Sequence, residues 1–97
     1  MEIRDILPET EILAQLAEEA AELAQAALKL RRVLDGTNPT PVPEGAARDN
    51  LMEEYGDVLN CMEQLLTAPD LAWCDDMRGR KKQRWKARLE KRGVQFD

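Results

Sequence analysis

Two acidic residues in the first part of the chain fall on a face that should be apolar. On a helix that advances about 100° per residue, an apolar stripe lies within about 40° of Ile12, and its other members are Leu16, Leu23, Leu30 and Leu34. Glu19 falls at about −20°, inside this stripe, and Glu22 at about −80°, on its flank. Burying an unpaired carboxylate costs several kcal/mol, so Glu19 is predicted to need a cation, a metal or a protonated state.

The same arrangement recurs in the middle of the chain. With Leu51 as the reference, an apolar stripe within about 40° is predicted, and its members are Leu51, Tyr55, Val58, Met62 and Leu65. Glu54 lies at the edge of this stripe, at about −60°, and Asp57 lies at about −120°. Each segment therefore offers two carboxylates three residues apart. Packing the two helices face to face would bring all four together.

Four converging carboxylates repel one another strongly unless cations lie between them. Ligation by oxygen alone suits Mg²⁺, with Mn²⁺ as a possible substitute, and Mg²⁺ usually shares its coordination sphere with substrate phosphates. Two alternatives are that the acids are solvated helix-surface groups, or that Arg and Lys side chains from another helix neutralise them. The matching register of the two pairs favours the metal site.

The segments that position these acids are predicted to be helices, at about residues 8–34, 44–67 and 70–92. Pro8 suits the first turn of a helix, and Gly36 stands where a helix C-terminus often has a glycine. Pro69 is expected to end the second helix, and Asp70 to cap the third. The stretch between Gly36 and Pro43 is rich in proline and is predicted to be a loop. It could close over a ligand, although a rigid connector is the simpler interpretation.

The length and composition favour a single all-α domain spanning residues 1–97. A chain of 97 residues has room for one core, and with one Phe, one Tyr and two Trp that core must be built from aliphatic side chains. Such a composition favours helices over a β-sandwich or barrel. Because three helices of this length bury little surface, we expect a helical bundle completed by homo-oligomerisation, as a dimer or tetramer.

The composition also excludes several kinds of chemistry. The chain has no histidine and only two cysteines, Cys61 and Cys74, without the paired spacing of a zinc site. Zinc, haem and Ser-His-Asp catalysis are therefore disfavoured. No stretch approaches the roughly 20 apolar residues that span a bilayer. We expect a soluble cytoplasmic protein with free thiols that does not bind membranes.

The charge is unevenly distributed along the chain. Residues 1–77 contain five basic and seventeen acidic residues, a net charge of −12, whereas residues 78–97 contain nine basic and two acidic residues, a net charge of +7. Lys81, Arg84 and Arg88 recur at a spacing that puts them on one helix face. They could contact phosphate oxygens. A solvated face that balances the acidic body is an equally good interpretation of such a run.

The acidic residues, taken as a pattern, resemble a known family signature. The chain contains Glu18-Glu19-Ala20-Ala21-Glu22 and, after a helix, loop and helix, Glu54-Tyr55-Gly56-Asp57. This pair of motifs is similar to the EExxE…ExxD signature of the MazG-like nucleoside triphosphate pyrophosphohydrolases. The resemblance covers most of the chain, from about Ile12 to Leu89. The resemblance implies an all-α, usually oligomeric hydrolase that uses Mg²⁺ to cleave an NTP or dNTP to the monophosphate and pyrophosphate. One use it implies for such an enzyme is house-cleaning of the nucleotide pool.

The resemblance also implies roles for individual residues. The implied metal ligands are Glu19, Glu22, Glu54 and Asp57. Glu18 would belong to the catalytic set, either as a group that supports the metal ligands or as one that orients water. The stretch from Lys81 to Leu89 is similar to a Lys-x-x-Arg-Trp-x-x-Arg-Leu segment of relatives, which implies phosphate contacts for Lys81, Arg84 and Arg88.

Recognition of the base or ribose is predicted only weakly. Gln15 lies one turn before Glu19, and Asn60 follows Asp57 by three residues, so either amide could donate to a nucleoside. Both are more often ordinary surface amides. A different class of function is also open, in which a non-enzymatic helical module uses its basic C-terminal helix to bind nucleic acid or an acidic partner. The net charge of −12 on the body makes nucleic acid the less favoured partner.

Overall fold

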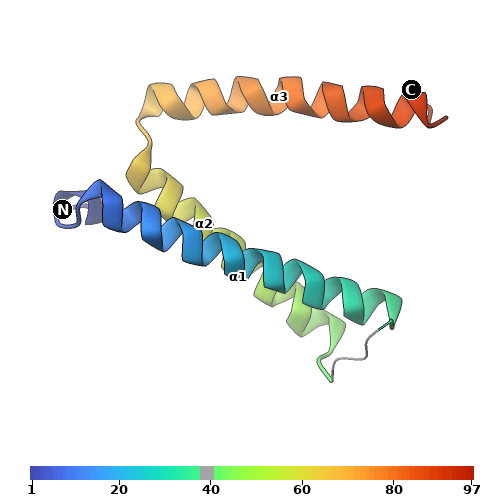
Figure 1. The fold of residues 1–97 in the computed structure, drawn as a ribbon, viewed down its shortest axis with the longest axis horizontal. Coiled ribbons are helices and arrows are strands. Elements are labelled where there is room, and N and C mark those ends of the chain that lie inside the picture. The colour runs from blue at the N-terminus through green and yellow to red at the C-terminus, as the bar shows by residue number, and fades with distance from the viewer. Residues whose placement is uncertain (38–40) are drawn as a thin grey trace. The chain divides into compact units, whose positions relative to one another are not determined.

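The chain is helical throughout its regular structure in the computed structural model, which describes residues 1–37 and 41–97 (Figure 1). A short 3₁₀ turn, η1, comes first and three long helices follow, and the bounds are η1 Ile3–Asp5, α1 Glu9–Asp35, α2 Glu44–Leu65 and α3 Ala68–Lys91. Helix accounts for 81% of the residues, with no strand in the described ranges. The all-α prediction is confirmed. None of the described helices combines the length and apolarity that a membrane span requires.

The described residues divide into two units, residues 1–65 and residues 66–97. The first contains η1, α1 and α2, and the second contains α3. The single-domain organisation and the bundle completed by further copies stay predictions.

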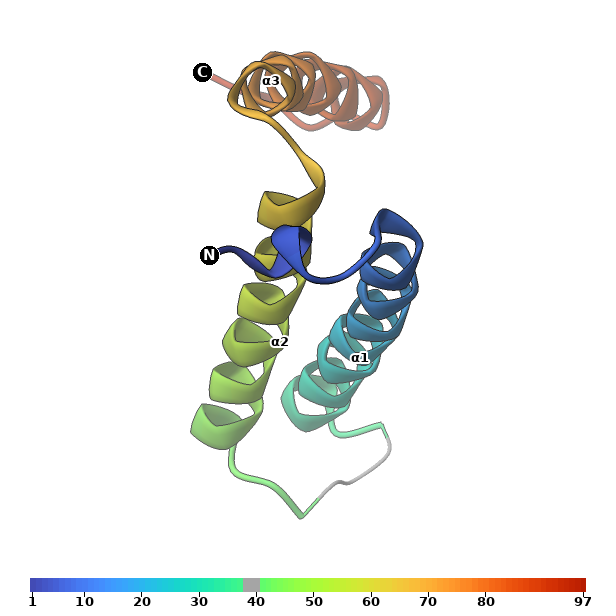
Figure 2. The same cartoon turned by 90° about the vertical axis from the view of Figure 1, so that its left-hand side faces the viewer.

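In the first unit, α1 and α2 lie side by side and antiparallel (Figures 1 and 2). Their shared seam follows a spacing of alternately three and four residues, which keeps one face of each helix turned toward the other. The buried residues of this seam are Ile12, Ala26 and Leu30 from α1, with Ala47 and Cys61 from α2. Glu19 lies on the same seam of α1, and Glu54 on the same seam of α2.

Two members of the predicted apolar stripes are exposed. Leu34 is 53% exposed and Tyr55 is 54% exposed. On α2 the buried face is centred on the small residues Ala47 and Cys61, which turns it by about 60° from Leu51 toward Glu54. This rotation moves Tyr55 out of the interface. It also moves Glu54 from the predicted edge of the stripe into the seam itself.

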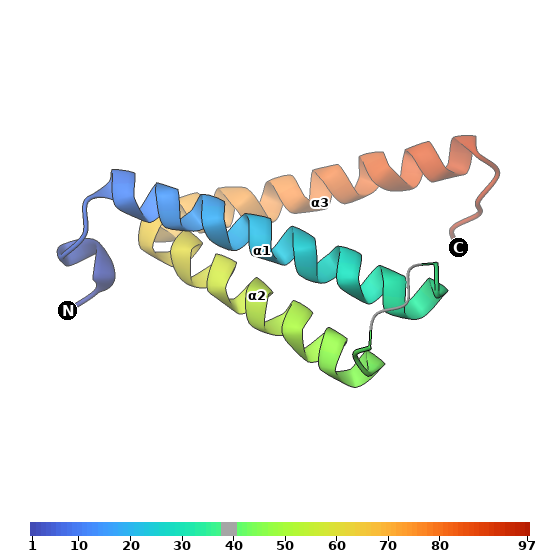
Figure 3. The same cartoon turned by 60° about the horizontal axis from the view of Figure 1, so that its bottom comes forward.

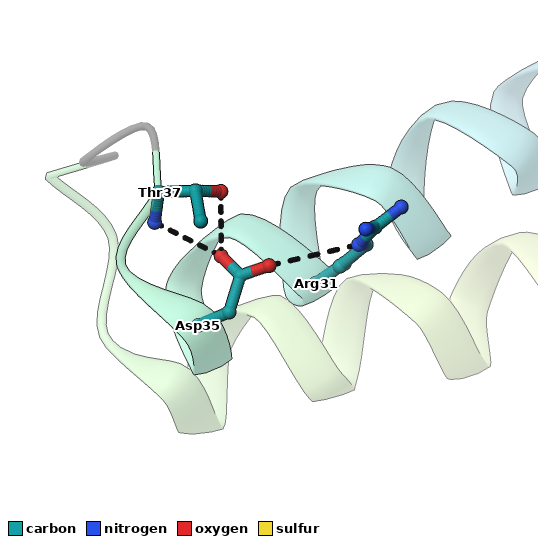
Figure 4. A network of polar contacts seen from close by, with 3 residues as sticks. All are labelled: Arg31, Asp35 and Thr37. Atoms are coloured by element: carbon teal, nitrogen blue, oxygen red, sulfur yellow. Dashed lines mark hydrogen bonds and ion pairs between the residues drawn. The ribbon is translucent and has the colours of Figure 1, made fainter.

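The end of α1 is fixed by its last turn and by the two residues that follow it (Figure 4). Gly36 adopts a left-handed conformation with φ 68°, and its N–H donates to the carbonyl of Arg32 at 2.9 Å. The Asp35 carboxylate accepts from both the backbone N–H and the hydroxyl of Thr37, at 3.0 and 2.7 Å, and lies 3.6 Å from the Arg31 guanidinium. The hydrogen bonds from Thr37 and the Arg31 charge hold the pKa of Asp35 below its usual value. Of the predicted loop between Gly36 and Pro43, residues 38–40 lie outside the described residues.

The N-terminal turn η1 is tied to the C-terminal part of α2 (Figures 2 and 3). The backbone N–H of Arg4 donates to the Gln64 side-chain oxygen at 3.0 Å, and the Gln64 amide in turn donates to the Glu2 carboxylate at 2.7 Å. These bonds place Ile3 beside α2. The first eight residues therefore form one end of the hairpin.

The second unit begins with a capping box rather than with the predicted cap. Thr67 is the N-cap of α3, and its hydroxyl accepts from the Asp70 backbone N–H at 3.3 Å. The Asp70 carboxylate reaches back and accepts from the Thr67 N–H at 2.9 Å. The prediction that Asp70 is the N-cap is wrong by one turn, because the reciprocal pair satisfies two free N–H groups at once. Pro69 lies within the first turn of α3, where a proline costs no hydrogen bond.

Candidate functional site

Four carboxylates from the two antiparallel helices converge near the middle of the hairpin. Glu19 and Glu22 come from α1, and Glu54 and Asp57 come from α2. One oxygen of each lies within 4.8 Å of the corresponding oxygens of the other three. Glu19 and Glu54 are half-buried in the seam, whereas Glu22 and Asp57 are exposed on its flank. The group is therefore anchored in the interface and opens to solvent on one side.

Two oxygens of this group are buried without a partner. They are Oε2 of Glu19 and Oε2 of Glu54. The other oxygen of Glu19, Oε1, accepts from the Gln15 side-chain amide at 2.7 Å. Buried acceptors without a partner are costly, because the group has lost water and gained nothing in exchange.

Within the described ranges, the first unit's own basic residues do not supply the missing partners. The ion pairs found in this unit involve other acids, Asp35 and Glu44. Among the described residues of the hairpin, no Arg or Lys forms an ion pair with the four converging acids. A divalent cation fits the donor set, because it takes carboxylate oxygens and offsets their mutual repulsion.

The repulsion within the cluster changes how two of its members titrate. The pKa of Glu22 is raised by hydrogen bonding with the Glu54 carboxyl and by the negative charge of Glu54. Loss of solvent around Glu22 raises this pKa further. At Glu19 the Gln15 hydrogen bond lowers the pKa, but loss of solvent and the charges of Glu22 and Asp57 outweigh it, so the pKa is raised. Without a cation, Glu19 and Glu22 thus hold their protons more tightly than isolated glutamates do.

Cys61 lies in the seam beside the acids and is buried. Burial raises the pKa of its thiol, and the charges of Glu19 and Asp57 raise it further. The thiol therefore stays protonated near neutral pH, and only the thiolate is a metal ligand. The candidate donors are the carboxylate oxygens alone.

The metal-free protein should lose stability as the pH rises above 4.5, the ordinary value for glutamate. Because the pKa values of Glu19 and Glu22 are raised in the folded state, the folded chain binds more protons than the unfolded chain between that pH and the raised pKa values. Asp35 and Asp70 affect stability in a different pH range. Their pKa values are lowered from 3.8, so the stability that they contribute is lost only as the pH falls below that value. Urea unfolding in EDTA between pH 5 and pH 7.5 measures the trend.

The control for this pH dependence is a surface acid on α2. Glu19→Gln should flatten the decline, whereas Glu53→Gln, at an exposed position outside the cluster, should leave it unchanged. Equal slopes for the two variants would contradict the origin assigned to the decline.

A cavity of about 190 Å³ adjoins the cluster at the η1 end of the hairpin. Glu19 and Asp57 lie on its wall, together with Gln15 and Asn60. The rest of the lining is mainly apolar, with Ile3, Leu7 and Ile12. The structure therefore brings both amides that the sequence singled out into one pocket beside the acids, and Gln15 also holds the Glu19 carboxylate.

The other predicted site residues lie outside this group. Glu18 is exposed on α1 and does not belong to the four converging carboxylates. Lys81, Arg84 and Arg88 are exposed on α3, in the second unit. The Arg84 guanidinium contacts the Met77 sulfur at 3.9 Å, within α3.

A second groove adjoins the cluster on the side toward the end of α1, and its basic residues are not among the site residues predicted from the sequence. Its volume is about 560 Å³, and its lining includes Glu22, Glu54, Lys29, Arg32 and Asn50. The signal was present in the sequence. Lys29 falls at about −100° from Ile12, close to the direction of Glu22, and Arg32 falls at about −160° on the same flank.

Comparison of the chain with protein-family models, with curated proteins and with solved structures finds no match.

Proposed function

We propose that the protein is a Mg²⁺-dependent nucleoside triphosphate pyrophosphohydrolase of the MazG-like kind, acting on the cytoplasmic nucleotide pool. The observation that carries the proposal is the convergence of Glu19, Glu22, Glu54 and Asp57 within 4.8 Å, with two buried oxygens that lack partners. These are the acids of the EExxE…ExxD pattern. A helical module that only binds other macromolecules has no reason to bury such a group.

The residues support this reaction in the following way. Glu19, Glu22, Glu54 and Asp57 would hold Mg²⁺, and Mn²⁺ could replace it. When bound, the ion neutralises phosphate oxygens and lowers the pKa of a coordinated water. In the hydrolysis, the water oxygen bonds to the α-phosphorus and the bond to the bridging oxygen breaks, which releases the monophosphate and pyrophosphate.

The neighbouring side chains orient the reactants. Gln15 holds the Glu19 carboxylate in place through its 2.7 Å hydrogen bond. Asn60 lines the adjoining pocket and can donate to a base or ribose. Glu18, exposed beside the first pair of ligands, is suited to accept a proton from the attacking water. Lys81, Arg84 and Arg88 on α3 are suited to bind phosphate oxygens.

The experiment that tests this proposal is product analysis with a panel of NTPs and dNTPs in the presence of Mg²⁺ or Mn²⁺. The expected products are the nucleoside monophosphate and pyrophosphate, with no release when EDTA is present. Release of orthophosphate with the diphosphate would contradict attack at the α-phosphorus. No turnover of any nucleotide at saturating metal would contradict the proposed activity.

The proposal includes a homo-oligomer, in which a second copy covers an apolar face of the hairpin. The face lies on the side opposite Glu22 and Asp57, at roughly 100° from the seam on α1 and roughly 130° on α2. The rotational sense is the same on both helices, so the antiparallel pair presents one continuous surface. Its exposed members are Leu13, Ala20, Ala24 and Ala27 from α1 and Met52, Tyr55 and Leu59 from α2.

The small core of the hairpin supports the same conclusion. In the described ranges the buried hydrophobic residues number five, Ile12, Ala26, Leu30, Ala47 and Cys61. A core of this size gives little stability on its own. A second copy of the hairpin presents an identical apolar face. Packing the two faces against each other would complete a four-helix arrangement with the acids on its outer sides.

A further inference from the structure

The two hollows beside the acidic cluster differ in chemistry, and they lie at opposite ends of it. Glu19 and Asp57 face the cavity of about 190 Å³, whose lining is mainly apolar and contains the amides of Gln15 and Asn60. Glu22 and Glu54 face the groove of about 560 Å³, which contains Lys29, Arg32 and Asn50. The four carboxylates therefore separate an apolar pocket from a cationic groove.

The two basic residues of the groove are available to bind an anion. Lys29 and Arg32 are half-buried on α1. Neither takes part in the ion pairs formed among residues 1–37 and 41–97. By contrast, Arg31 and Arg48 pair with the acids four residues away, Asp35 and Glu44. The half-buried positions limit solvent screening of the two charges, which strengthens any contact with a bound anion.

The spacing along α1 places these charges within reach of a ligand held at the cluster. Lys29 follows Glu22 by seven residues, a rise of about 10.5 Å, and Arg32 follows by ten, about 15 Å. Helical side chains lean toward the N-terminus of their helix, so both long side chains extend back toward the carboxylates. Asn50 precedes Glu54 by one turn on α2 and lies on the same side of the cluster.

We infer that this groove, through Lys29 and Arg32, binds the phosphate chain that leaves as pyrophosphate, while the apolar pocket receives the nucleoside end. The inference rests on the proposed function, because it orients the proposed substrate across the metal site. A cation bound by the carboxylates would lie at the reacting phosphate, between the two hollows. The groove thus supplies within the first unit the cationic contacts that the sequence assigned to α3.

The size of the apolar pocket limits what it receives. Its volume of about 190 Å³ is below the roughly 300 Å³ at which pockets for drug-sized ligands begin. It suits one heteroaromatic ring whose edge meets the amides of Gln15 and Asn60. The substrate class that fits both hollows is a nucleoside triphosphate with a single-ring base.

The test is calorimetric binding of inorganic tripolyphosphate in MgCl₂ to the 97-residue chain. The double variant Lys29→Gln, Arg32→Gln should bind about tenfold more weakly or worse, the loss that follows from removing charge-assisted hydrogen bonds. The matched control, Arg31→Gln with Arg48→Gln, removes the same charge from the same unit and should bind as the wild type does. Circular dichroism checks that each variant keeps its helices.

The outcomes separate this inference from the proposed activity. Wild-type affinity in the Lys29→Gln, Arg32→Gln variant, or a loss seen only when Lys81 and Arg84 are replaced by Gln, would overturn the groove assignment even if pyrophosphate is released from nucleotides. Absence of tripolyphosphate binding to the wild type would also overturn it. Binding that depends on Lys29 and Arg32, without nucleotide hydrolysis, would support the groove and reject the hydrolase.

Discussion

Glu19→Gln is expected to lower kcat/KM for nucleotide hydrolysis by about a hundredfold or more, while the helix content stays unchanged. The amide keeps the shape of the side chain but removes the charge that holds a divalent cation. Glu19 is half-buried, and one of its oxygens is buried without a hydrogen-bond partner. The substitution removes a repulsive charge from the seam, so the metal-free variant should be at least as stable as the wild type. The measurement is steady-state release of pyrophosphate at saturating Mg²⁺.

Two further variants make this result specific. Asp57→Asn removes the carboxylate of the second pair that faces the same pocket, and it should cause a loss of similar size. Glu53→Gln, an exposed position on α2 outside the cluster, should keep wild-type activity. Full activity of Glu19→Gln or Asp57→Asn with a folded chain would refute the assignment of these acids.

Leu59→Glu is expected to convert the protein to a monomer at concentrations where the wild type is an oligomer. Leu59 is 47% exposed on the apolar face, and pairing two copies would bury the new carboxylate against apolar side chains, at a cost of several kcal/mol. Sedimentation velocity over a range of protein concentrations measures the change.

The matched control for the apolar face is Ala14→Glu. Ala14 is exposed on α1, outside the proposed face, and the substitution adds the same charge there. It should leave the oligomer intact. A monomeric wild type, or equal sedimentation of the two variants, would contradict the proposed interface.

Much of the hairpin could be predicted from the sequence because its signals agree with one another. The long run without glycine or proline after Pro8, the glycine at position 36 and the leucine spacing all indicate the first helix, and α1 spans Glu9–Asp35. The register of Glu19 on that stripe was enough to predict a carboxylate inside the interface. Its convergence with acids of the second helix required only that the two helices pack against each other.

The orientation of the second helix was harder to predict, and the reason lies in its composition. Apolar residues cover a wide arc of α2, because Tyr55 and Leu59 form a second stripe next to the one that packs on α1. Periodicity alone does not say which stripe faces the partner helix. The small residues Ala47 and Cys61 decide it, since they allow the closest approach and are buried to 1% and 8% exposure.

The cationic groove was missed for a different reason. Lys29 and Arg32 stand in a run of mixed charge near the end of α1, where basic residues also suit the helix dipole. Only the antiparallel packing of α2, which brings Asn50 and Glu54 alongside, shows that they border a groove next to the acids. The capping box of Thr67 and Asp70 was likewise visible only as a pair, since each residue alone is an adequate cap.

Titration of the protein with Mn²⁺, followed by the electron paramagnetic resonance signal of the free ion, tests most directly whether the four carboxylates form a metal site. The wild type should bind Mn²⁺ saturably, and Mg²⁺ should compete. Glu54→Gln, which removes a half-buried ligand of the seam, should lose this binding, whereas Glu53→Gln at the neighbouring exposed position should retain it. Equal binding by Glu54→Gln and the wild type, or no binding to the wild type at millimolar Mn²⁺, would contradict a metal site at this position.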